Sequence, residues 1–137
     1  NLFTITGPGS PSVLSNMPVS IEQHVDWITD CIDHCIKIGC TSIEAQEKAA
    51  EIWTDHVRET ADATLLPKVQ HSWYLGANIP GKPRVFMPYA GGLNIYRKIC
   101  DNIAEEGYKG FELNSEKVRD TSMSLDVNSS EGFWLGV

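Results

Sequence analysis

Residues 7–18 contain two glycines and three prolines, and this dense run of backbone-restricting residues limits what the chain can form around it. Glycine adopts backbone angles that other residues avoid, whereas proline fixes φ and removes an N–H donor. Before the run, residues 1–6 alternate and carry β-branched and aromatic side chains, which predicts a strand. After it, isoleucine and valine recur at helical spacing from Ile21 onward. The run is therefore predicted to be a stiff strand-to-helix crossing, suited to form a wall against a flat ligand.

The first predicted helix follows this crossing. Ser20 and Gln23 have the spacing of a capping box, so the helix is expected to begin near Ile21, and Gly39 is expected to end it. Its charged residues lie mostly on one face, and its apolar residues form a stripe of the kind that normally covers a core. The stripe consists of Ile21, Val25, Ile28, Cys31, Ile32, Cys35 and Ile36.

Two further helices are predicted. Residues 41–44 resemble a second capping signal, and an apolar face then runs to about Ala63. A third amphipathic pattern extends from Leu93 to Ile103, with Gly107 at the position where a left-handed residue stops a helix. Residues 108–113 are expected to add a short edge strand. The predicted fold class is thus an α/β fragment, mainly helical in isolation, with three amphipathic helices and an N-terminal strand.

A long aromatic loop separates the second and third helices. From Leu65 the helical pattern stops, and glycines and prolines alternate with aromatic residues as far as Gly92. Long loops in compact domains are often lids or binding loops. Trp73 and Tyr74 are therefore candidates to cover a ligand, with Lys82 and Arg84 as candidates to contact phosphates. On pattern alone, aromatic residues that simply pack on the core are the more ordinary interpretation.

Composition narrows the class of protein. The 137 residues are 42% hydrophobic and 21% charged, as in an ordinary single globular domain. A net charge of −7 opposes binding to nucleic acid, because no cluster of cations offsets the repulsion from phosphates. Neither a signal peptide nor an apolar segment long enough to span a membrane is visible, which predicts a cytoplasmic location. Since the sequence opens with Asn1 inside an apparent strand, we expect a piece of something longer.

Common catalytic and metal motifs fit poorly. The four cysteines lack zinc-site spacing and are expected to be buried apolar residues, so no metal is predicted. No nucleophile elbow supports a hydrolytic triad that uses His56 and Asp55. Residues 7–12 lack the third glycine and the lysine of phosphate-binding loops. Two alternatives remain: a plain turn, or a site where the amides of Asn16 and Met17 face an electron-rich atom of a ring.

Several short sequence motifs closely resemble motifs of the flavin-dependent Baeyer-Villiger monooxygenases. The resemblance covers about the first 113 residues, and its motifs are highly specific. The matching segments are 1–3 (NLF), 7–12 (GPGSPS), 14–17 (LSNM), 20–25 (SIEQHV), 61–65 (ADATL), 72–74 (SWY), 76–86 (GANIPGKPRVF), 91–92 (GG) and 107–111 (GYKGF).

The resemblance implies a C-terminal portion of a much longer flavoprotein with two dinucleotide-binding domains. Residues 1–113 would complete the FAD-binding domain, with a mobile control loop at about 65–90, and residues 114–137 would be a polar, loosely ordered tail. The implied reaction uses FAD, NADP and O2 to convert a ketone into an ester or lactone. The implied partner is the missing N-terminal part of the enzyme. Since that part carries the catalytic arginine, no catalytic residue is expected in this chain, which should be inactive alone.

The resemblance also implies roles for seven residues. Ser12, Val13, Leu14 and Ser15 would shape the substrate pocket, Asn16 and Met17 would contact FAD, and Trp73 would fold over NADP. A different class of function stays open, in which the chain is a non-catalytic helical module or truncated gene product that binds a partner chain.

Overall fold

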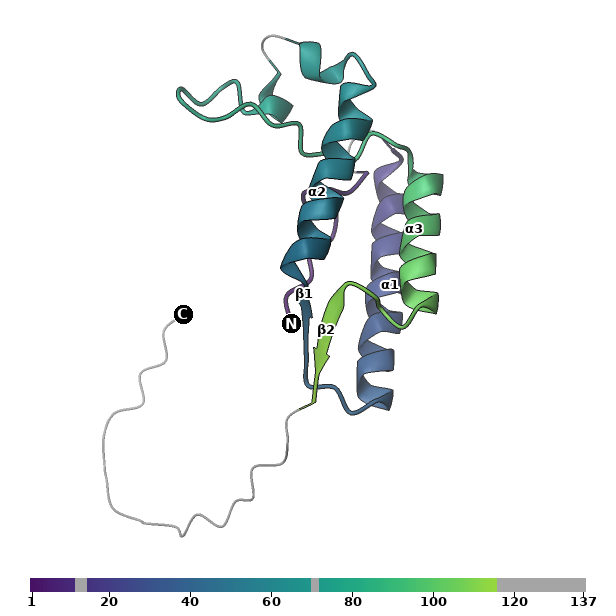
Figure 1. Ribbon diagram of the computed structural model, residues 1–137. Coiled ribbons are helices and arrows are strands. Elements are labelled where there is room, and N and C mark those ends of the chain that lie inside the picture. Colours follow the sequence, from purple (N-terminus) through teal and green to yellow (C-terminus); the bar gives the residue numbers. More distant parts are fainter. Residues whose placement is uncertain (12–14, 70–71, 116–137) are drawn as a thin grey trace, which may run out of the picture.

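The computed structural model describes residues 1–11, 15–69 and 72–115. It contains three α-helices, as predicted, and a two-stranded antiparallel sheet that joins residues distant in sequence. Helices α1 and α3 lie side by side, with α2 next to them and the sheet at one end (Figure 1). The elements in chain order are α1 (Met17–Lys37), β1 (Ser42–Ala45), α2 (Glu47–Asp62), the short 3-10 helices η1 (Leu66–Lys68) and η2 (Trp73–Leu75), α3 (Leu93–Glu105) and β2 (Phe111–Asn114).

Helix α1 begins four residues earlier than predicted and ends where predicted. Pro18 fits in the first helical turn, where a missing N–H costs nothing, so the helix starts at Met17. The predicted capping box is wrong, because Ser20 lies inside α1 and its hydroxyl shares a hydrogen bond of 2.6 Å with the hydroxyl of Ser15, which precedes the helix. At the other end Gly39 has φ +69°, and Cys40 N–H donates to Cys35 O at 2.8 Å, as in a Schellman motif.

The N-terminal strand is a wrong prediction. Residues 1–6 form no strand in the structure, although Asn1 docks on β1. The Asn1 ammonium donates to Ile43 O at 3.0 Å, and Asn1 Oδ1 accepts from Ile43 N–H at 2.9 Å. The alternating pattern needs a neighbouring strand along its whole length, but contact with β1 is limited to this end. Thr6 has φ +53°, so the backbone leaves the extended region there.

The second capping signal is also wrong, because residues 42–45 form strand β1. They pair with β2 in the register Ser42 opposite Asn114 through Ala45 opposite Phe111. The predicted short strand near residues 108–113 is confirmed by β2, while its partner was missed. Gly107 ends α3 with φ +72°, as predicted, and the chain turns through Tyr108 at φ +62° into β2. This turn places β2 against β1.

The apolar stripe of α1 is mostly exposed, contrary to its predicted amphipathic role. Ile32 is 45% and Ile36 is 71% exposed. Four side chains of α1 are buried, and of these only Cys31 belongs to the stripe. These buried residues are Ser20, Gln23, His24 and Cys31.

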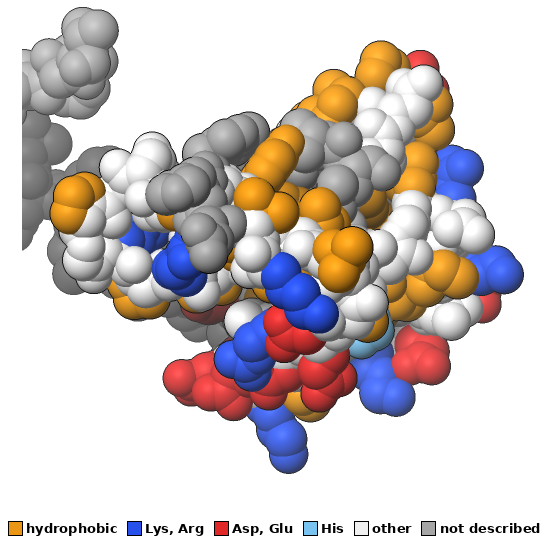
Figure 2. Space-filling model, turned by 90° about the horizontal axis from the view of Figure 1, so that it is seen from above, with side chains coloured by type: hydrophobic (Ala, Val, Ile, Leu, Met, Phe, Trp, Pro, Cys, Tyr) orange, Lys and Arg blue, Asp and Glu red, His pale blue; other side chains and the backbone are white. Residues whose placement is uncertain are grey.

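The buried core is small and divided. One cluster joins Cys31, Ile43 and Tyr108 beneath the sheet, and another joins Ala61, Leu75 and Phe86 at the carboxyl end of α2. In Figure 2 hydrophobic side chains gather mainly on one side of the molecule and acidic side chains on the opposite side. No helix in the described ranges is long and apolar enough to cross a membrane.

Candidate functional site at the amino end of α1

The glycine- and proline-rich loop is pinned to the segment that precedes α3. Gly9 N–H donates to Met87 O at 2.9 Å, and Tyr89 N–H donates to Ser10 O at 2.9 Å. Ser10 is buried, and its hydroxyl donates to Gly7 O at 2.7 Å. These bonds fix residues 7–10 of the loop, and we call this fixed part the wall.

The loop also lies unusually close to α2. Gly9 has φ +78°, and a Cβ atom at this position would lie 2.8 Å from Nε1 of Trp53. Both the backbone angle and the missing side chain therefore require glycine here. The close approach fixes the distance between the loop and α2.

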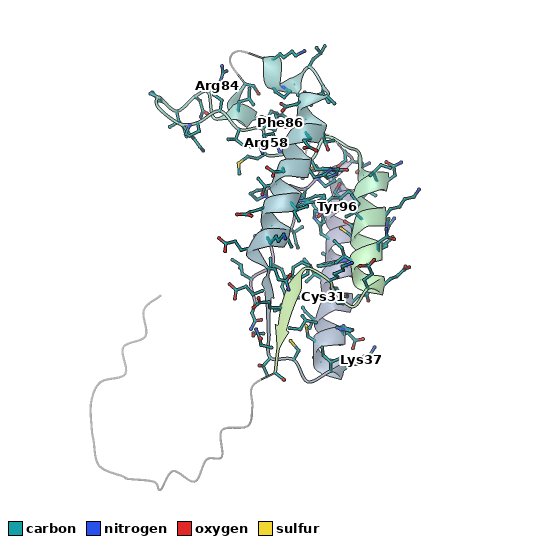
Figure 3. All side chains as sticks on the ribbon, viewed as in Figure 1. Cys31, Lys37, Arg58, Arg84, Phe86 and Tyr96 are labelled. Carbon is teal, nitrogen blue, oxygen red and sulfur yellow. The ribbon has the colours of Figure 1, made fainter. Side chains whose placement is uncertain are left out.

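Four rings behind the loop form an aromatic cluster made of Trp53, His56, Tyr89 and Tyr96. Trp53 stacks on Tyr89 with ring centroids 5.3 Å apart and planes inclined by 27°, and it also contacts Tyr96 of α3. Tyr96 lies between α3 and α2 (Figure 3). Burial raises the pKa of both tyrosines, so they stay neutral and act as packing groups, not as bases.

The first turn of α1 has no side-chain cap. Asn16 occupies the N-cap position without a side-chain cap, and the first turn contains no acidic residue. The first amides of a helix have no intrahelical acceptor and carry partial positive charge. Because Pro18 has no N–H, the remaining donors lie close to Met17. An electron-rich oxygen or nitrogen of a ring can be bound there.

The structure describes only part of the predicted site. Ser12, Val13 and Leu14 lie outside the described residues, as does the side chain of Trp73. Ser15 is placed firmly, since its hydroxyl donates to Pro11 O at 2.5 Å and shares a hydrogen bond with Ser20. Asn16 is exposed and Met17 is half-buried, so both lie beside the fixed wall at the start of α1.

Sequence reasoning missed two residues that hold this wall. Tyr89 is 1% exposed, and Ser10 joins it through the backbone bond described above. Tyr89 precedes a pair of glycines, and a Cβ on Gly91 would lie 2.3 Å from the Tyr89 hydroxyl oxygen. The glycine pair after Tyr89 is a sequence signal of tight packing around that ring. Only the fold shows that Tyr89 packs on the loop that contains Ser10.

The aromatic loop has an anchored base and an exposed tip. Leu75 and Phe86 are buried against Ala61 of α2. Residues 77–85 are all exposed, and the loop extends away from the helices (Figure 1). The Arg84 guanidinium donates to Val69 O at 3.5 Å, which joins the two sides of the loop. The predicted long loop is thus confirmed.

Metal and hydrolytic chemistry find no support in the described residues. Cys31 is fully buried, as predicted, and desolvation together with the neighbouring Cys35 raises its pKa to about 12. Within residues 1–11, 15–69 and 72–115 no group of three His, Cys, Asp or Glu side chains is arranged to hold a metal ion. The Asp55 carboxylate accepts from the Arg58 guanidinium, while His56 packs in the aromatic cluster.

Known proteins similar to this chain are monooxygenases. A cyclohexanone 1,2-monooxygenase of Acinetobacter sp is 41% identical over 117 residues, which cover 85% of this chain and 21% of that enzyme. A Baeyer-Villiger monooxygenase of Pseudooceanicola batsensis is 44% identical over 108 residues, or 79% of this chain and 19% of that protein. No protein-family model matches the chain.

Solved structures agree with these relatives. The structure of oxidized steroid monooxygenase bound to NADP matches with a TM-score of 0.74 and 47% identity, covering 82% of this chain and 20% of that chain. The structure of OTEMO in complex with FAD and NADP matches with a TM-score of 0.73 and 28% identity, covering 82% and 20%. The homologues of this chain are therefore Baeyer-Villiger and related flavin monooxygenases, and the chain spans about a fifth of the length of the relatives that it matches.

Proposed function

We propose that this chain is the C-terminal portion of an FAD- and NADP-dependent Baeyer-Villiger monooxygenase that converts ketones into esters or lactones with O2. The observation that carries the proposal is the 41% identity over 117 residues to a cyclohexanone monooxygenase. Residues 1–113 would complete the FAD-binding domain, with residues 114–137 as a polar tail. A cytoplasmic location belongs to the same proposal.

The amino end of α1 suits the polar edge of a flavin ring. Asn16 leaves the helix uncapped, and the absence of acidic residues in the first turn leaves the partial positive charge of the helix end uncompensated. The backbone amides near Asn16 and Met17 would bind the ring there. FAD, when bound and reduced by NADPH, supplies the chemistry that activates O2. The protein would hold the ring, orient the ketone and exclude water.

The substrate wall and the lid are separate parts of the proposal. Residues 12–15 would line the ketone pocket, and Ser15 supports this because its bonds to Pro11 O and to Ser20 fix one end of the wall. Trp73 would cover NADP as part of the 65–90 control loop. The buried base and exposed tip of that loop support a lid that moves while staying attached.

The remaining four fifths of the enzyme would supply the catalytic machinery. We expect that part to pack on the stripe of α1, in which Ile36 is 71% and Ile32 is 45% exposed. Without it the ketone pocket and the rest of the cofactor sites would be incomplete. The chain alone should therefore have no monooxygenase activity.

A complementation assay tests this function. The chain and the separately produced remainder of the same enzyme are mixed with FAD, NADPH and a ketone, and the ester or lactone is measured. Product from the mixture, but from neither part alone, is the expected result. Turnover by the isolated chain would contradict the proposal. Association of the two parts without flavin or product would instead favour the non-catalytic helical module.

A further inference from the structure

Three cysteine thiols gather where α1 ends and the chain turns toward β1. Cys31 and Cys35 lie one turn apart on α1, and Cys40 lies between the end of that helix and β1. Cys31 is fully buried against Ile43 and Tyr108, on the part of α1 that lies next to the sheet (Figure 3). Cys35 and Cys40 are only partly buried. All three thiols are free, and the proposed flavin site uses none of them.

The turn after α1 brings Cys35 and Cys40 together. Cys40 N–H donates to Cys35 O at 2.8 Å, and Gly39 allows this sharp reversal with φ +69°. The side chains also meet, because the thiols of Cys35 and Cys40 share a hydrogen bond. A disulfide requires Cα atoms within about 7 Å of each other and side chains that point toward each other. The shared backbone bond and the thiol contact supply both conditions.

The other cysteines are poorer partners for this pair. The Cys31 thiol also contacts that of Cys35, but Cys31 is fully buried, so an oxidant in solvent cannot reach it. Cys100 lies on α3, where its carbonyl accepts from Trp27 Nε1–H at 2.8 Å. In the part of the chain that the structure describes, no three such side chains are arranged to hold a metal ion. The thiols positioned to react with each other are therefore those of Cys35 and Cys40.

We infer that Cys35 and Cys40 are a reversible redox pair, which low-molecular-weight disulfides oxidise to a disulfide that joins the end of α1 to the segment before β1. One protein thiolate attacks a sulfur of the small disulfide, which gives a mixed disulfide and releases one small thiolate. The second protein thiolate attacks the mixed disulfide at the protein sulfur and releases the other small thiolate. Two electrons pass from the protein to the small disulfide, and the two thiol protons end on the two small thiols.

Oxidation changes contacts on both sides of the turn. In the reduced chain the Cys40 thiol donates to Ser42 O at 2.9 Å, and the disulfide removes this donor from the first residue of β1. Burial, together with the contact to Cys40, raises the pKa of the Cys35 thiol, so its thiolate is scarce and exchange is slow at neutral pH. Disulfides of cytoplasmic proteins are typically transient and redox-sensing, which fits a reversible pair in the proposed location.

Oxidised glutathione is the probe that tests the pair. The folded chain is incubated with it in a mildly alkaline buffer, remaining thiols are alkylated in denaturant, and tryptic peptides are analysed by mass spectrometry. Trypsin cuts after Lys37, between the two cysteines, so a disulfide from Cys35 to Cys40 joins residues 1–37 to residues 38–48. The expected main product is this linked pair of peptides without glutathione, in which Cys31 is alkylated. Reduced glutathione in excess should reverse the link.

Cys40→Ser and Cys100→Ser are the matched variants, since each removes one partly buried thiol. Cys40→Ser is expected to abolish the link and to stop at a mixed disulfide on Cys35. Cys100→Ser should give the linked peptides in the same yield as the unaltered chain. Circular dichroism of both variants checks that the helices are retained.

Four results would each overturn the inference: a chain that stays reduced, a stable mixed disulfide in the unaltered chain, a link that includes Cys31, or a disulfide between two copies. Loss of the link in Cys100→Ser with the helices retained would also overturn it. The proposed function is tested separately, because both cysteines lie at the carboxyl end of α1, away from the candidate site at its amino end.

Discussion

At the residue scale, the candidate site depends on positions where only one side chain fits. Gly9 combines a positive φ with a backbone that lies against Trp53. Ser10 and Tyr89 then fix the loop through a backbone bond of 2.9 Å. The geometry at the start of α1 therefore depends on a glycine at position 9.

Gly9→Ala is expected to destabilise the chain by about 2–4 kcal/mol, since it adds left-handed strain and an overpacked methyl group near Trp53. Gly39→Ala is the matched control. Gly39 also has a positive φ, but nothing lies within 4 Å of its missing Cβ, so only the strain of about 1–2 kcal/mol should appear. Urea unfolding of both variants measures the difference. Equal losses would mean that the approach to Trp53 is unimportant.

His24 should make stability depend on pH. Burial lowers its pKa in the folded state below the ordinary 6.5, so the unfolded chain binds the proton more readily. Its contribution is present above pH 6.5 and is lost as the pH falls from there through the folded-state pKa. The free energy of unfolding, measured by urea between about pH 5 and pH 8, should fall less steeply in His24→Gln. An unchanged slope in the variant would refute this assignment.

Local chemistry explains why some residues were predicted correctly. Gly39 and Gly107 stop their helices because a left-handed position favours glycine whatever surrounds it. Ser20 was misassigned because α1 begins before it and its hydroxyl has a competing partner in Ser15. Hydrogen-bond partners that are distant in sequence, such as Tyr89 for Ser10, cannot be predicted from the local sequence pattern.

At the element scale, α1 has three faces where a helix on a complete core has two. A polar face with Gln23 and His24 is buried inside this chain, and an acidic face with Asp26 and Asp33 is exposed to solvent. The aliphatic stripe between them is mostly uncovered. The helical spacing of the stripe was predicted correctly. This spacing does not show whether residues of the same chain pack on the stripe.

Ile32→Glu tests the role of the stripe. The free energy of unfolding of the isolated chain should change by no more than about 0.5 kcal/mol, because Ile32 is 45% exposed. Affinity for the remainder of the enzyme should fall about tenfold or more, since a charge would be buried in an apolar contact. Lys37→Gln, which makes the same change in net charge on an exposed position, is the control. Unchanged affinity of Ile32→Glu would show that the stripe is not the contact surface.

The pairing of β1 with β2 contains an unfavourable contact that can be relieved. Glu44 lies directly opposite Glu112, and like charges in such pairs are destabilising. Glu44→Lys should stabilise the chain by about 0.5 kcal/mol at low salt, with a smaller gain at high salt. Glu51→Lys makes the same charge change on α2 without a cross-strand partner. Thermal unfolding at two salt concentrations checks both, and an equal effect of the two variants would exclude the cross-strand explanation.

At the scale of the whole molecule, large apolar side chains are exposed around a small core. Its buried clusters are small and separate, whereas Leu2 and Ile36 are 89% and 71% exposed. The three helices and the long aromatic loop follow from periodicity and from glycine and proline. Residues 1–6 do not form the expected strand, because only Asn1 bonds to β1 and the backbone leaves the extended region at Thr6. An apolar pattern predicts a helix or strand, but it does not show which surface covers its apolar face.

We propose that this chain completes a flavin site together with the remainder of the enzyme. The most direct measurement is flavin absorbance that stays with protein after gel filtration of the two parts mixed with FAD. We expect a flavin-bearing complex of both parts, a markedly reduced yield with Gly9→Ala, and no flavin retained by this chain alone. A remainder that holds the same amount of flavin with and without the chain would contradict the account.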